Sequence, residues 1–302
     1  NFQISNLHPA DRLSLTDRVD RFDAKFKSDL GITPIKLLQL YKKHNPEAQP
    51  IFTRLQKGDY SIALMIPQIH LTKILSEGIK NLHETKQGGG IEDLKIRQAV
   101  ELSLSQLTEK QFYELPDEQK PKYAMLWPEI KSSLKNDHIP RFGDMALILK
   151  KEKLKNHMTW SPLDSFDLIR DQYFEGLVAG QVISASKLNW YQQFIPMSRI
   201  ELAALFIHAF DKVEMSSKSR NRSFMPKKME LGPLSEMTLY FNPPRRANSY
   251  IEFQIWSEIK PTDVEAIVFL GEPPSVEVIE KLEDRSIKVY DGRSGYRIPW
   301  AK

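Results

Sequence analysis

The chain has 302 residues, of which 41% are hydrophobic and 27% charged, as is ordinary for a globular protein. The formal net charge of +4 is mild for this length and makes nucleic acid an unlikely partner, although short basic clusters occur. The sequence has no cysteine, which excludes disulfides and thiolate metal sites. No apolar run approaches the roughly 18 residues that cross a bilayer, so we expect no membrane span. The first residues also lack the basic and apolar regions of a Sec signal.

Several well-known catalytic motifs are absent from the sequence. The seven histidines show no HExxH spacing, so we expect no metal site. There is no GxSxG elbow, P-loop or GxGxxG, which argues against a serine hydrolase, a nucleotide kinase and a Rossmann enzyme.

The first part of the chain is predicted to be helical. Apolar residues in the range 9–30 recur every three or four positions, the spacing of an amphipathic helix. Thr33 stands directly before a proline, a combination typical of a helix start. We predict an N-terminal helical region, residues 1–58, ahead of one larger domain, residues 59–302.

The larger domain mixes strand and helix patterns. Residues 60–66 form a nearly continuous apolar strand, and residues 69–78 a helix that ends at a glycine. We predict a mainly helical insertion over about 166–212, interrupted by a polar and aromatic stretch. Residues 214–235 are polar and basic and are predicted to form a mobile loop. Two further strands are predicted within 248–269.

One of these strands carries a carboxylate in its middle. Glu252 and Gln254 alternate with Ile251, Phe253 and Ile255, the period of two that is typical of a strand. Either the strand has a solvated outer face that includes Glu252, or the carboxylate lines a cleft.

A series of short segments occurs in the order seen in one superfamily. The segments are Leu82-His-Glu-Thr85 with Gly88-Gly-Gly90, Arg97-Gln-Ala-Val-Glu101, Lys120–Leu126, Pro140–Lys150, Met158–Ser165 and Tyr250-Ile-Glu-Phe-Gln254. In this succession the chain resembles ADP-ribosyltransferase-like proteins of the bacterial toxin and effector type. It is most similar to an uncharacterised bacterial domain family and, more distantly, to arginine ADP-riboxanase effectors. The resemblance implies an α+β fold with a split antiparallel β-sheet core.

The resemblance also implies NAD as cofactor and a set of site residues. Glu252 would hold the ribose and stabilise the oxocarbenium-like centre as nicotinamide leaves, with Gln254 beside it on the catalytic strand. The expected cofactor-binding residues are His83, Thr85, Arg97, Tyr123, Phe142, Thr159 and Ser161. Among these, Arg97 would bind phosphate, and the rings of Tyr123 and Phe142 would pack against nicotinamide or adenine. The hydroxyls of Thr159 and Ser161, on a short strand, would support Glu252.

Some residues depart from the family pattern. The first strand, residues 60–66, supplies neither the Arg nor the His that family members place there. Trp256 stands where the bacterial family often has His, and Tyr250 replaces the first glutamate of a Glu-x-Glu motif. The identity of the acceptor residue, arginine or another, therefore stays open. It also stays open whether the chain is a catalytically degenerate member of the superfamily.

Two functions follow as expectations. The first is a secreted bacterial effector that ADP-ribosylates a host protein in the host cytosol, by simple transfer or ADP-riboxanation, with a host activator protein as a further partner. The second is a non-catalytic module of the same fold that binds a host protein. If the chain is not secreted, we expect it in the cytoplasm.

Overall fold

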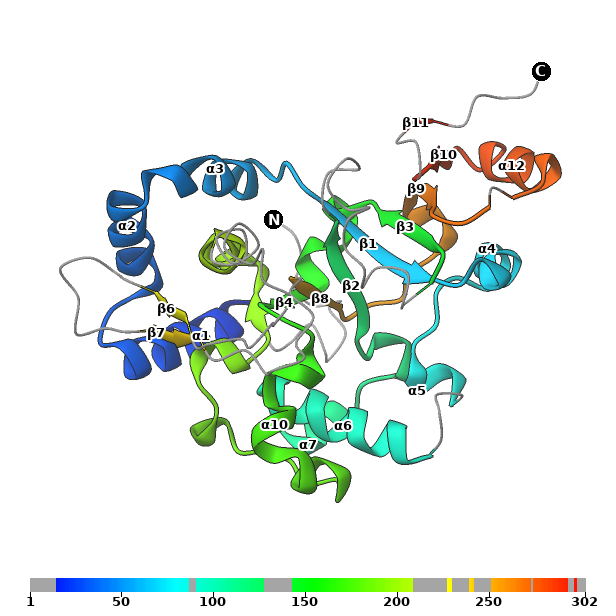
Figure 1. Ribbon diagram of the computed structural model, residues 1–302. Helices are drawn as coiled ribbons and strands as arrows, with labels where there is room; N and C mark the ends of the chain where they lie inside the picture. The colour runs from blue at the N-terminus through cyan, green and yellow to red at the C-terminus, as the bar shows by residue number, and fades with distance from the viewer. Residues whose placement is uncertain are drawn as a thin grey trace, which may run out of the picture. The chain divides into compact units, whose positions relative to one another are not determined.

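The computed structural model describes residues 15–86, 91–127, 143–208, 227–229, 239–241, 251–272, 274–292 and 296–297. This part of the chain is mixed α+β, with N-terminal helices and mostly antiparallel strands, which confirms the expected class (Figure 1). The chain forms two compact units. Unit 1 comprises residues 1–59, 86–116 and 159–252, and unit 2 comprises residues 60–85, 117–158 and 253–302.

Unit 1 begins with three helices: α1 (Leu15–Leu30), α2 (Pro34–His44) and, after the 3-10 turn η2 (Pro46–Ala48), α3 (Gln49–Lys57). The predicted start of α2 is confirmed. The side chain of Thr33 accepts a hydrogen bond from the backbone N–H of Lys36 at 3.3 Å, so it supplies an acceptor that the first helical turn lacks.

The described part of unit 1 also contains α6 (Ile91–Ser105), α7 (Glu109–Tyr113), β4 (Met158–Ser161), α10 (Ser165–Val178), η7 (Ala185–Lys187), η8 (Trp190–Gln192), β5 (Ile195–Pro196), η9 (Met197–Leu202), the helical residues 203–208, β6 (Lys227–Met229), β7 (Leu239–Phe241) and the first residue of β8 (Glu252–Ile255). The prediction for 166–212 is correct for α10 and for residues 203–208, which are α-helical, but between them the chain forms short 3-10 turns and the strand β5. The loop predicted for 214–235 is wrong at β6, because this strand pairs antiparallel with β7.

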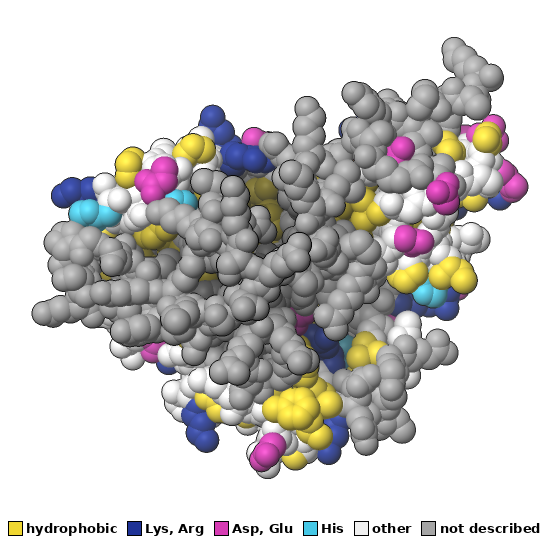
Figure 2. Space-filling view, in the orientation of Figure 1, with side chains coloured by type: hydrophobic (Ala, Val, Ile, Leu, Met, Phe, Trp, Pro, Cys, Tyr) yellow, Lys and Arg dark blue, Asp and Glu magenta, His cyan; other side chains and the backbone are white. Residues whose placement is uncertain are grey.

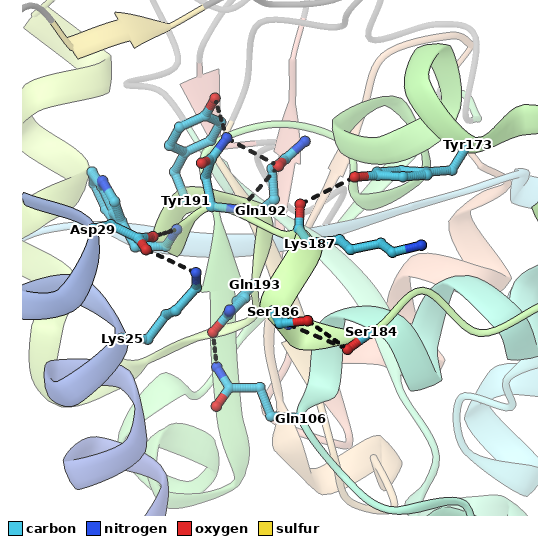
Figure 3. Close-up of polar contacts among 12 residues, drawn as sticks. Lys25, Asp29, Gln106, Tyr173, Ser184, Ser186, Lys187, Tyr191, Gln192 and Gln193 are labelled. Carbon is cyan, nitrogen blue, oxygen red and sulfur yellow. Dashed lines mark hydrogen bonds and ion pairs between the residues drawn. The ribbon is translucent and has the colours of Figure 1, made fainter.

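The short 3-10 turns keep their shape through polar contacts (Figure 3). Tyr173 of α10 donates its hydroxyl hydrogen to the carbonyl of Lys187 at 3.1 Å. Asp29 of α1 pairs with Lys25 at 2.8 Å and accepts the backbone N–H of Trp190 at 2.8 Å. Sequence periodicity missed this segment because its backbone groups bond to side chains that are distant in the sequence.

Aromatic packing forms the core beneath α1. The rings of Phe26 and Trp190 lie 4.7 Å apart between centroids, and those of Trp190 and Phe206 lie 5.8 Å apart. All three side chains are buried. Each large aromatic side chain contributes about 2 kcal/mol or more by burial, so this cluster helps to attach α1 within unit 1.

Unit 2 is built on β-strands, helped by short helices. Its elements are β1 (Ser61–Ile66), η3 (Gln68–His70), α4 (Leu71–Glu77), α5 (Leu82–Thr85), η4 (Asp117–Gln119), β2 (Lys122–Trp127), β3 (Met145–Leu149), α9 (Lys151–Leu154), η6 (Lys155–His157), η10 (Pro261–Asp263), β9 (Val264–Phe269), α12 (Val276–Glu283), β10 (Lys288–Asp291) and β11 (Tyr296–Arg297), with most of β8.

The strands of unit 2 follow the order β11-β10-β9-β3-β1-β2-β8 (Figure 1). The pairs β1–β2, β1–β3 and β3–β9 are antiparallel, whereas β9 and β10 are parallel and are connected through α12. Every residue of β3 is buried, which explains its continuous apolar sequence.

Gly78 ends α4, as the sequence predicts. Its φ of +80° lies in a region that residues with a side chain rarely adopt. A Cβ atom at this position would also lie 2.7 Å from the carbonyl oxygen of Ile259. Ile79 and Ile259 then form an isolated antiparallel bridge, so the glycine lets two backbone segments approach closely.

Candidate functional site

The expected catalytic residue Glu252 is the first residue of β8 and belongs to unit 1. Its side chain is only 3% exposed, and all four residues of the strand are buried. The interpretation of this strand as one with a solvated outer face is therefore wrong, because both of its faces are covered. A carboxylate can remain charged in such a place only if polar groups surround it.

The N-terminus of α10 supplies such a group. The backbone N–H of Ser165 donates to Oε1 of Glu252 at 3.0 Å. Ser165 is the first residue of α10, and the preceding Asp164 caps the helix by accepting the N–H groups of Phe166 at 2.9 Å and Asp167 at 3.4 Å. The first N–H groups of a helix have no partner inside it and carry partial positive charge, so they stabilise a carboxylate.

Arg97 reaches the same serine from another helix. Its Nη1 donates to Oγ of Ser165 at 3.4 Å. Arg97 lies on α6, which packs along α10 (Figure 1). The structure thus brings two of the expected site residues, Arg97 and Glu252, to a single side chain and its backbone. We call Arg97, Ser165 and Glu252 the Ser165 cluster.

Thr159 and Ser161 lie on β4, at the entrance to α10. Both are buried, with exposed fractions of 4% and 0%. Thr159 pairs with Pro196 in the β4–β5 ladder. Ser161 donates its hydroxyl hydrogen to the carbonyl of Leu163 at 2.8 Å, and this bond fixes the turn that leads into α10.

Four other expected site residues belong to unit 2. His83 and Thr85 lie in the short helix α5. His83 is 1% exposed, and Thr85 donates its hydroxyl hydrogen to the carbonyl of Asn81 at 3.1 Å. Gln254 is fully buried in β8, and Tyr123 is partly exposed on β2. The remaining residue, Phe142, is outside the described residues, as is the Gly88–Gly90 loop.

Sequence reasoning missed Ser165 as a site residue and also missed a buried lysine in unit 2. Nζ of Lys122 lies 3.2 Å from Oε2 of Glu84, and it donates to the carbonyls of Glu118 at 2.8 Å and Ser257 at 3.2 Å. We call these four residues the Lys122 cluster. Burial lowers the pKa of Lys122, because loss of solvation outweighs the attraction of Glu84. The sequence feature that could have revealed this buried lysine is its position at the start of an apolar strand pattern.

Basic side chains of the described residues do not gather in one place on the face shown in Figure 2. The lysines of the 150–155 cluster have partners inside unit 2. Lys150 donates to the carbonyl of Thr262 at 2.8 Å, Lys153 pairs with Asp263 at 3.4 Å, and Lys155 pairs with Glu152 at 2.7 Å.

No helix in the described ranges is long and apolar enough to cross a membrane. Within the same ranges, no group of three or more His, Asp or Glu side chains is arranged to hold a metal ion.

Comparison with known proteins adds no relative: no protein-family model, no curated protein and no solved structure matches this chain.

Proposed function

We propose that the protein is an NAD-dependent ADP-ribosyltransferase that modifies a protein acceptor, with Glu252 as its catalytic carboxylate. The observation that carries the proposal is the position of Glu252, which is held by the Ser165 N–H next to a serine that also contacts Arg97. The resemblance of the sequence to bacterial toxin and effector transferases supports the same reading. It also supports a split-sheet transferase core, NAD as cofactor and a host protein as substrate.

The chemistry makes sense of this arrangement. During transfer, the bond between the ribose and nicotinamide breaks, nicotinamide leaves with the electron pair, and a nucleophilic atom of the acceptor forms the new bond. Positive charge develops on the ribose, and a carboxylate held in one place stabilises it without reorganisation in the transition state. Arg97, a permanent cation, is suited to the phosphates of NAD.

One observation favours a second candidate, a non-catalytic module of the same fold that binds a protein partner. Glu252 is 3% exposed and Gln254 is fully buried. A carboxylate that accepts from a helix N-terminus can have a purely structural role, in which it joins a strand to that helix. In this second reading the protein has no affinity for NAD.

The first experiment is to measure nicotinamide release from NAD by the parent, by Glu252→Ala and by Glu265→Ala. Glu265 is an exposed glutamate on β9 whose side chain pairs with Lys288 at 3.5 Å, which makes it a matched control. We expect at least about 100-fold slower release in Glu252→Ala and no change in the control. Equal release by all three proteins would remove Glu252 from the mechanism.

Absence of release by the parent would leave two cases, which NAD titration calorimetry separates. Binding without turnover supports a transferase that waits for an activator or an acceptor. No binding supports the partner-binding module instead.

A further inference from the structure

Ser165 contacts two functional candidates through two different groups. Its backbone N–H donates to Oε1 of Glu252 at 3.0 Å, and its Oγ accepts from Nη1 of Arg97 at 3.4 Å. The residue is fully buried and stands at the first position of a helix of 14 residues. These contacts join β8 and α6 to the start of α10.

We propose that Ser165 is a positioning residue, which holds Glu252 through its N–H and Arg97 through its hydroxyl. The effect of Ser165 on catalysis rests on the proposed function. The two hydrogen bonds are features of the structure and do not depend on that function. Since the two contacts use different atoms, they can be removed separately. The N–H sets the place of the carboxylate, and the hydroxyl sets the place of the guanidinium.

Two substitutions separate these roles. Ser165→Ala removes the hydroxyl and keeps the N–H, whereas Ser165→Pro removes both. Proline is well tolerated at the first position of a helix. The ψ angle of Asp164, 125°, lies in the range that a residue before proline adopts. The difference between the two variants therefore reports the N–H that Glu252 accepts.

Steady-state kinetics of nicotinamide release give different expectations for the two variants. In Ser165→Ala we expect the KM for NAD to rise several-fold with kcat nearly unchanged, because Arg97 loses one contact. In Ser165→Pro we expect the same KM as in Ser165→Ala and a kcat about tenfold lower, because Glu252 loses a charge-assisted hydrogen bond. Circular dichroism checks that α10 stays folded. Equal kcat in the folded variants would overturn the proposal.

A second measurement does not depend on activity. With serine labelled by ¹⁵N, exchange of the Ser165 amide hydrogen is compared in the parent and in Glu252→Ala. We expect at least about tenfold faster exchange in the variant, because the amide loses its acceptor. The amide of Ser76, in α4 of unit 2, is the control and should not change.

The two measurements distinguish the two possible failures. Unchanged exchange at Ser165 would overturn the positioning role whether or not the protein turns over NAD. Faster exchange, in a protein that neither binds nor cleaves NAD, would keep the contact between Ser165 and Glu252 and overturn the proposed function.

Discussion

The two units each bury a charged side chain, and they hold it in different ways. In the Ser165 cluster of unit 1, the glutamate accepts from a helix N-terminus, and the serine that holds it also contacts an arginine. In the Lys122 cluster of unit 2, the lysine lies against two backbone carbonyls and one carboxylate. In each unit, polar groups of its own secondary structure therefore offset the desolvation free energy of the buried charge.

The difference concerns what each charge does. Three acceptors surround the ammonium of Lys122, and they come from α5, the η4 turn and the second residue after β8, so the lysine connects separate parts of unit 2. Glu252 is held at a helix end, where positive partial charge favours a carboxylate. We therefore expect loss of Lys122 to damage the fold and loss of Glu252 to damage the chemistry.

Lys122→Met should have the largest effect on stability. The substitution keeps an apolar chain of similar length but removes the cation that pairs with Glu84 and the donor to two buried carbonyls, so we expect a loss of roughly 3 kcal/mol in the free energy of unfolding. Urea denaturation measures it. Lys155→Met, which removes an exposed ion pair with Glu152, is the control and should leave the free energy of unfolding almost unchanged. A similar small loss in both variants would show that Lys122 does not hold unit 2 together.

The difference in the free energy of unfolding between the parent and Lys122→Met should depend on pH with a definite sign. Burial places the folded-state pKa of Lys122 below its ordinary value of 10.5. Between that lowered pKa and 10.5, the unfolded chain binds a proton that the folded chain has released, so the stability of the parent relative to Lys122→Met should rise with pH. A fall in the same window would contradict the assignment.

Glu252→Gln should affect stability less. The amide oxygen of glutamine can still accept the Ser165 N–H, and only the attraction between charge and helix is lost, so we expect a loss of about 1 kcal/mol. Nicotinamide release should nevertheless fall at least about 100-fold, because a neutral amide does not stabilise the positive ribose. A loss as large as that of Lys122→Met, measured by urea denaturation, would make Glu252 a structural residue like the lysine.

Asp164→Ala tests the helix end itself. The N–H groups of Phe166 and Asp167 would lose their acceptor, and we expect a loss of about 1 kcal/mol by thermal denaturation. Asp164→Asn is the matched control, because asparagine caps a helix about as well. An equal loss in both variants would mean that the charge, rather than the cap, stabilises α10.

Tyr60→Phe should have the smallest effect at neutral pH and a visible one in alkali. Burial, with a smaller contribution from Glu152, raises the pKa of Tyr60 to about 12. Between its ordinary value of 10.0 and about 12, the folded chain keeps a proton that the unfolded chain loses, so stability falls with rising pH. Alkaline unfolding should therefore be shallower in Tyr60→Phe. Identical alkaline unfolding curves for both proteins would mean that the phenol of Tyr60 is solvated in the folded state and that its pKa is not raised.

Much of the local structure could be predicted from the sequence. The start of α2 at Thr33, the stop of α4 at Gly78 and the strand patterns of β1 and β9 were readable, because caps, glycines and periodicity act over a few residues. The 3-10 turns after α10 were not readable, because contacts such as that of Trp190 with Asp29 of α1 decide their shape.

The same division applies to the candidate site. The sequence by itself supplied two of the candidates, the strand glutamate Glu252 and the arginine Arg97, but not the serine between them. Only the tertiary structure decided that Glu252 and Arg97 meet at Ser165, that β8 is buried on both faces, and that Lys122 is surrounded by acceptors. The reason is that hydrogen bonds between residues far apart in the sequence depend on how strands and helices pack, and that packing leaves no local pattern.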